Sequence, residues 1–125
     1  MQRLMHSFVK TGVDFKTTGA ILIGTTNDTI TDRFIPVFVL FHVTTSTSPS
    51  AVPTISVGYT ASGYTDLLTA TSITSLSALN SYRHIQLNAA GNVSVPSNTG
   101  IYINISVGAT GTALTGQVAI WGYYI

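Results

Sequence analysis

The chain has 125 residues, a length typical of one domain built around one hydrophobic core. Only 7% of its residues are charged and its net charge is +1, which excludes the clustered basic surface that nucleic-acid binding requires. Hydrophobic residues make up 45% of the chain, a balance opposite to that of disordered proteins.

The most apolar stretch, residues 34–43, contains Pro36 and His42 and is much shorter than the roughly 20 residues of a membrane-spanning helix. We therefore expect no membrane partner. The chain has no cysteine, so neither disulfides nor thiolate metal sites can stabilise it. Its polarity comes from serine and threonine instead of charge.

Alternation of hydrophobic and polar residues predicts short strands along most of the chain. In chain order, we expect strands over residues 13–17, 20–23, 34–43, 54–60, 83–87, 93–95, 101–107 and 117–125. The stretch 34–43 is rich in β-branched and aromatic residues, so we expect both of its faces to be covered. Residues 66–80 are too rich in serine and threonine for a helix, and we predict a long loop with room for one helical turn.

The alternation also predicts which side chains face the core. The residues expected to point inward include Ile55, Val57, Tyr59, Ile85, Leu87, Ile101, Ile103, Ile105 and Val107. About eight short strands separated by Gly, Pro, Ser and Asn predict an all-β fold, an antiparallel β-sandwich of the jelly-roll kind. Residues 13–125 form its single domain, and residues 1–12 form either a docking arm or the first strand.

Residues for catalysis are scarce. Glutamate and cysteine are absent, so acid–base chemistry falls to three histidines and four aspartates. We interpret His42 as a hydrogen-bonded structural residue, His84 as a surface residue, and Asp28 and Asp32 as turn-capping residues instead of ligands for a hard cation. No G-x-S-x-G or H-E-x-x-H motif occurs. We predict no enzyme activity, no cofactor and no metal.

Several segments in the last three quarters of the chain resemble small virion proteins of tailed bacteriophages, notably phages of cyanobacteria. The segments that carry this resemblance are RFIP at 33–36, PTISVG at 53–58, YTDLL at 64–68, IYINI at 101–105, GT at 111–112 and VAIWGYYI at 118–125. The resemblance implies a trimeric jelly-roll module that serves either as capsid cement, also called a decoration protein, or as a tail-fibre tip. The aromatic last strand is also similar to that of tumour-necrosis-factor-like and C1q-like trimers.

Between these roles, the absence of coiled-coil heptads and collagen repeats favours cement, because a fibre tip is normally fused to such a shaft. The partners implied are further copies of the chain, as a homotrimer, and the major capsid protein. The expected location is the capsid surface of the virion, after synthesis in the host cytoplasm. The alternative is a module that binds a host-surface receptor or glycan, with Tyr59, Tyr64 and Tyr82 as sugar-stacking candidates.

Two sets of residues are candidate interaction sites. High hydrophobicity with little charge indicates that much of the surface is buried against copies of the chain. The aromatic end of the chain is either in the middle of a sheet or at a subunit axis, and it supplies the candidate trimer interface: Trp121, Tyr123, Tyr124 and Ile125. The candidate capsid-docking residues lie near the start of the chain: Arg3, Leu4, Met5, Phe8, Val9 and Lys10.

Overall fold

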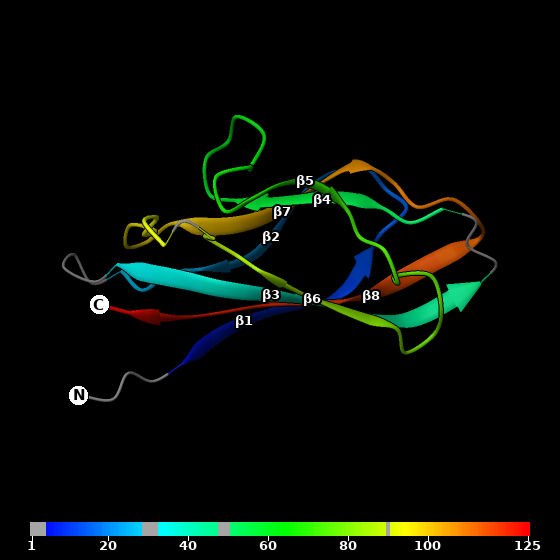
Figure 1. Cartoon of the computed structure of the whole chain (residues 1–125), viewed down its shortest axis with the longest axis horizontal. Coiled ribbons are helices and arrows are strands. Elements are labelled where there is room, and N and C mark those ends of the chain that lie inside the picture. Colours follow the sequence, from blue (N-terminus) through cyan, green and yellow to red (C-terminus); the bar gives the residue numbers. More distant parts are fainter. Residues whose placement is uncertain (1–4, 29–32, 48–50, 90) are drawn as a thin grey trace.

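The computed structural model describes residues 5–28, 33–47, 51–89 and 91–125. These residues form eight β-strands (Figure 1): β1 (His6–Asp14), β2 (Gly19–Thr25), β3 (Phe34–Thr47), β4 (Thr54–Gly58), β5 (Leu68–Ser72), β6 (Tyr82–Gln86), β7 (Gly100–Val107) and β8 (Ala113–Tyr124). Across the described ranges, no helix has the length and apolarity that a membrane crossing demands.

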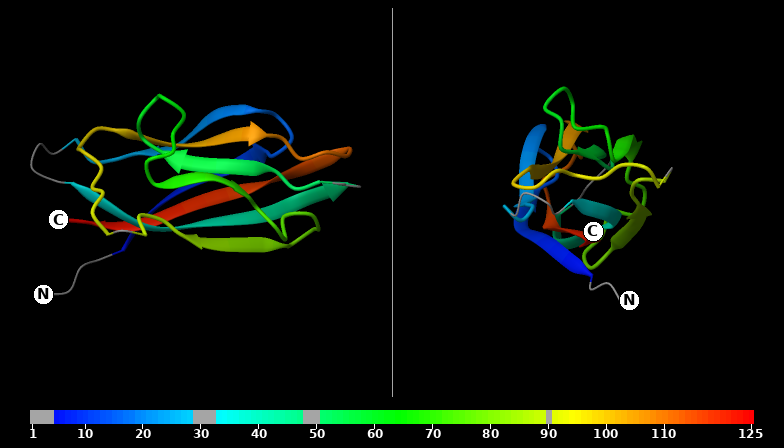
Figure 2. Two further views of the ribbon diagram at one scale, coloured as in Figure 1. Left: turned by 45° about the horizontal axis from the view of Figure 1, so that its top comes forward. Right: turned by 90° about the vertical axis from the view of Figure 1, so that its left-hand side faces the viewer.

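The strands form two four-stranded sheets that lie face to face (Figure 2). One, the β8 sheet, has the order β1-β8-β3-β6, and the other, the β7 sheet, has the order β2-β7-β4-β5. Every neighbouring pair is antiparallel. A chain folded back on itself at its midpoint gives four of these pairs: β1–β8, β2–β7, β3–β6 and β4–β5. When this double-stranded ribbon wraps around a core, two further pairs form, β8–β3 and β7–β4. This order is a jelly roll and confirms the predicted fold class.

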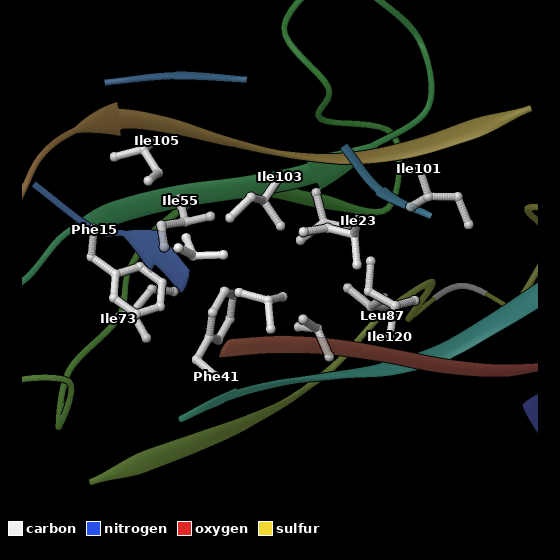
Figure 3. Close-up of a cluster of buried hydrophobic side chains, with 14 of the residues drawn as sticks. Phe15, Ile23, Phe41, Ile55, Ile73, Leu87, Ile101, Ile103, Ile105 and Ile120 are labelled. Atoms are coloured by element: carbon white, nitrogen blue, oxygen red, sulfur yellow. The ribbon is translucent and has the colours of Figure 1, made fainter. Parts of the chain in front are cut away.

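The core lies between the two sheets and is made by alternate residues of their strands (Figure 3). From β7, the fully buried side chains are Ile101, Ile103 and Ile105. From β8 they are Leu114, Val118 and Ile120. The inward orientation predicted for β4, β6 and β7 is confirmed, except that Val107, at the end of β7, is 57% exposed.

The first strand differs from the prediction for residues 13–17. It begins at His6 and ends at Asp14, so residues 6–12 belong to the sandwich and pair with β8. A bulge between Lys10 and Val13 contains Gly12, whose φ of 67° favours glycine. Most β1 side chains are exposed because β1 is an edge strand, so the alternation that marks a strand is absent from its sequence.

Two other segments also differ from the prediction. The expected loop at residues 66–80 contains β5, an edge strand of five residues with exposed or half-exposed side chains. No helical turn follows it, because residues 73–81 form turns closed by short-range backbone hydrogen bonds. Residues 93–95 form no strand, and Val95 makes only an isolated bridge to Phe34.

The two faces of β3 are covered unequally. Phe34, Val39 and Phe41 are completely buried on the inner face. Phe38 and Leu40 point to the other side and are only half-buried. The prediction that both faces of residues 34–43 are covered therefore fails for a single chain within its described residues, because no layer of those residues lies outside the β8 sheet (Figure 2).

Candidate interaction surface

The carboxylates in the described part of the chain do not assemble a metal site: no three His, Cys, Asp or Glu side chains gather there. Asp66 uses both oxygens within its own loop. Its Oδ1 accepts a hydrogen bond from the Tyr59 N–H (2.9 Å), and its Oδ2 accepts one from the Thr60 hydroxyl (2.6 Å). Asp28 is exposed, and Asp32 lies outside the described residues.

The three histidines lie on three different strands. The ring of His6 lies 5.0 Å from that of Tyr124, and the ring of His84 lies 4.5 Å from that of Phe38. His42 Nδ1 is 3.2 Å from the side-chain amide nitrogen of Gln117, in agreement with the structural role predicted for it. His84 is exposed, as expected. These contacts with rings and an amide are typical of packed side chains and not of a proton-transfer pair.

A hollow of about 350 Å³ lies beside the edge strands β5 and β6. Two of its polar side chains are used internally, and one is Asn88, whose amide donates to the Val93 carbonyl (2.8 Å) and accepts from the Val93 N–H (3.0 Å). Asp66, also in the lining, is held by Tyr59 and Thr60. Because these groups already have partners within the chain, they are poorly placed to bind a polar ligand.

The outer face of the β7 sheet is mixed in polarity and partly covered: Leu22, opposite Tyr102, is 43% exposed, while Asn104 and Ser106 are polar. The loop 59–66 folds over it, and in Figure 1 this loop rises above β4 and β7. The Tyr64 ring packs on Tyr102 at 4.6 Å, and the Ser56 hydroxyl donates to the Gly63 carbonyl (3.1 Å). The chain thus covers part of this face with its own loop.

The three tyrosines considered for sugar stacking do not come together. Tyr64 packs in the loop over the β7 sheet, and Tyr59 is half-buried against the core. Tyr82 is 66% exposed on β6, in the other sheet. The structure therefore assembles no joint stacking platform from these residues.

The outer face of the β8 sheet, in contrast, is bare and apolar. Its centre is a stack of rings: Phe38 lies 5.9 Å from Trp121 at an interplanar angle of 17°, and His84 packs on the other side of Phe38. We call this surface the aromatic face and define it by these outward residues: Val9, Phe38, Leu40, Tyr82, His84, Ala119 and Trp121.

The aromatic face carries no formal charge. The charged residues nearest to it in β1 and β6, Lys10 and Arg83, stand opposite the inward residues Val118 and Phe41 in the sheet register. Arg83 also donates a hydrogen bond to the Thr74 hydroxyl (3.0 Å). Asp14 lies beyond the face, at the end of β1. The polar groups on the outward side near the stack include the amides Gln86 and Gln117, the ring of His42, and Ser7 opposite Trp121.

The four predicted interface residues at the end of the chain divide between the two sides of the sheet. Trp121 belongs to the aromatic face, and Tyr123, half-buried, points to the same side. Tyr124 packs inward on Phe34 at 5.2 Å, and its hydroxyl accepts a hydrogen bond from the Asn27 N–H (3.0 Å). Ile125 follows β8 and is 53% exposed. The strand itself lies in the middle of its sheet.

The predicted docking residues also divide. Arg3 and Leu4 lie outside the described residues, and Met5 is 45% exposed just before β1. Phe8 points inward and packs on Phe34 at 5.2 Å. Val9 points outward and is 52% exposed, and Lys10 is exposed. Their role in capsid docking stays a prediction.

Five residues of the aromatic face, Phe38, Leu40, Tyr82, His84 and Ala119, are absent from both sequence-based sets of interaction residues. A signal for the first two was present, since residues 34–43 are apolar at both odd and even positions. A strand of that kind needs cover on both faces. The sequence did not decide whether the same chain or a second copy supplies that cover.

No family model matches the chain, and no curated protein matches it. Solved structures do resemble it. A chain in the capsid asymmetric unit of cyanophage Pam1 is 17% identical, with a TM-score of 0.57, over 95% of this chain and 84% of that one. A chain in the capsid of Ralstonia phage GP4 is 13% identical, with a TM-score of 0.60, over 99% of this chain and 84% of that one.

A third similar chain belongs to the acidic stable capsid structure of Helicobacter pylori bacteriophage KHP30. It is 10% identical, with a TM-score of 0.61, over 98% of this chain and 93% of that one. At these identities the likeness shows a shared fold. It extends over nearly the whole chain, so the sandwich as a unit, and not a fragment of it, is what the three phage chains share with this protein.

Proposed function

We propose that this chain is a structural protein of a bacteriophage virion that attaches to the capsid as a cement, or decoration, protein. The observation that carries the proposal is the match of its whole jelly roll to chains from three phage capsids. The sequence resemblance to small virion proteins of tailed phages agrees with it. The inventory of the described residues, with turn-closing aspartates and packed histidines, supports a role in binding instead of catalysis.

In this proposal the protein acts as a homotrimer, and its second partner is the major capsid protein at the virion surface. The protein would be made in the host cytoplasm and join the shell there. It binds the assembled lattice and not the dissociated subunits, so its binding free energy adds to the stability of the shell by mass action. Interfaces of such permanent kind are large and apolar.

The test uses capsids that lack the protein, incubated with the purified chain and then separated from unbound protein by sedimentation. We expect the protein to sediment with the capsids, and the decorated particles to release their DNA at a higher temperature than undecorated ones. Failure to bind capsids would contradict the proposal. Binding to host cells without binding to capsids would replace it with the receptor-binding alternative.

The predicted docking role of the N-terminal segment is tested with a separate truncated variant. Because residues 6–10 are part of β1, their removal would uncover the edge of β8 and confuse docking with folding. A chain without residues 1–5 leaves β1 complete. If the segment docks the protein, this variant should remain assembled and lose capsid attachment. Normal attachment of the shortened chain would contradict the docking role of residues 1–5.

A further inference from the structure

We infer that the aromatic face of the β8 sheet is where one copy of this chain binds the next. This inference rests on the homotrimer in the proposed function and names the surface that forms it. It differs from the sequence-based interface, because Tyr124 is directed into the core and the centre of the contact moves to the stack of Phe38, Trp121 and His84.

The first argument is the difference between the two outer faces of the sandwich. The β7 sheet presents Asn104 and Ser106 and is partly covered by the loop 59–66. The β8 sheet has no such cover, although its centre is aromatic. Monomeric proteins seldom leave a contiguous apolar surface of this kind in water, so cover from another molecule is expected.

The second argument is size. The outer face of four strands, about 4.8 Å apart and about ten residues long, measures roughly 19 Å by 33 Å. Its flat area is about 600 Å², and the projecting side chains add to this area. A standard protein–protein interface buries about 800 Å² on each partner. The whole face is therefore comparable to the smaller specific contacts, and in a closed ring one copy divides it between its two neighbours. The face also has the usual composition of an interface, with aromatic residues at the centre and uncharged amides, Gln86 and Gln117, beside them.

The third argument is charge, and it selects a second copy as the occupant. No Asp, Glu, Lys or Arg lies at the outward positions that define the face, so the face offers a charged partner no permanently charged group and would strip the hydration from that partner's charges. An identical face brings no such cost and no like-charge repulsion. In a closed ring, each contact joins two different sides of the face. Val9 at the β1 side and Tyr82 at the β6 side would then both be buried.

The experiment measures the mass of the purified chain by sedimentation equilibrium without capsids. Two variants place a charge on the aromatic face: Val9→Lys at its edge and Leu40→Lys at its centre. The matched control is Val107→Lys, since Val107 is 57% exposed and Val9 is 52% exposed, and both lie on strands. Wild type and Val107→Lys should have the mass of three chains at micromolar concentration.

The two face variants should sediment as monomers, with association at least about 100-fold weaker, because each contact would bury an unpaired ammonium group. Far-UV circular dichroism and a cooperative melt verify folding. If Leu40→Lys does not fold, Val9→Lys decides alone, since its side chain is more than half exposed. Trimers of unchanged affinity in the folded face variants would overturn the inference.

Trp121 is the only tryptophan of the chain and lies on the face, so its fluorescence gives a second readout. On dilution of the wild type, its emission should move to longer wavelength at the concentration where the mass falls. Dissociation without that shift would overturn the inference. The sedimentation and fluorescence experiments use no capsid, so they test this inference separately from the cement role. A trimer that behaves as expected in them but fails to bind capsids would refute the cement role alone. A wild-type monomer that binds capsids would refute this inference alone.

Discussion

Asp14 closes the turn that leaves β1. Its Oδ1 accepts a hydrogen bond from the Lys16 N–H (2.9 Å), and its Oδ2 accepts one from the Thr17 hydroxyl (2.7 Å). The Lys16 N–H, and after it the Thr17 hydroxyl, hold the pKa of this carboxyl below its ordinary value of 3.8. The ionised form is therefore favoured by folding, so its stabilisation is present above pH 3.8 and is lost as the pH falls through the lower pKa of the folded state.

We expect Asp14→Asn to lower the free energy of unfolding by about 0.5–1 kcal/mol at pH 7, because the amide nitrogen cannot accept the bond from Thr17. Urea unfolding at several pH values measures the difference. The variant and the wild type should converge as the pH drops below the pKa of the folded carboxyl. A difference that stays constant down to pH 2 would contradict the assignment. Asp28→Asn, a change at an exposed loop carboxylate, is the control.

At the scale of the element, β8 is the strand on which the sheet depends. It pairs on one side with β1, an edge strand, and on the other side with β3. Gly122 lets the two backbones approach, since a Cβ there would meet the Ile35 carbonyl oxygen and the Phe34 ring. The oxygen belongs to the backbone of the paired strand and cannot rotate away as a side chain would.

Gly122→Ala should therefore reduce the free energy of unfolding by about 3 kcal/mol, the upper part of the range for an overpacked site. Denaturant unfolding measures it. The matched control is Ala113→Ser, an enlargement on the outward side of the same strand but outside the aromatic face, with an expected loss of less than about 1 kcal/mol. Equal losses in the two variants would mean that the strands can separate enough to admit a methyl group.

At the scale of the whole molecule, the fold closes by joining the two ends of the chain. His6 stands opposite Gly122, and Tyr123 stands opposite Ile35 in the neighbouring strand. The start of β1 and the end of β8 lie on the same side of the molecule in Figure 1. The sandwich is therefore complete only when residues from the beginning, the first third and the end of the chain are all present.

Removal of residues 121–125 should abolish folding. It takes away the ring contacts of Trp121 with Phe38 and of Tyr124 with Phe34, and it unpairs the starts of β1 and β3. Each lost aromatic side chain buries about 150–250 Å² when packed. We expect an insoluble chain, or a soluble one without a cooperative melt. A truncated protein that is soluble and melts cooperatively would show that the end of β8 is dispensable.

The sequence by itself determined the fold class and most of the inward residues of β4, β6 and β7, because their alternation follows from which side chains must leave water. It left residues 1–12 open between a docking arm and the first strand and missed β5, since most side chains of these edge strands lie in water. The tertiary structure alone decided that Tyr124 faces the core and that Phe38, Leu40 and Trp121 share a bare face. The physical reason is that the alternation of side chains shows which residues share one face of a strand. Only the pairing of strands far apart in the chain decides which of the two faces is packed against other segments.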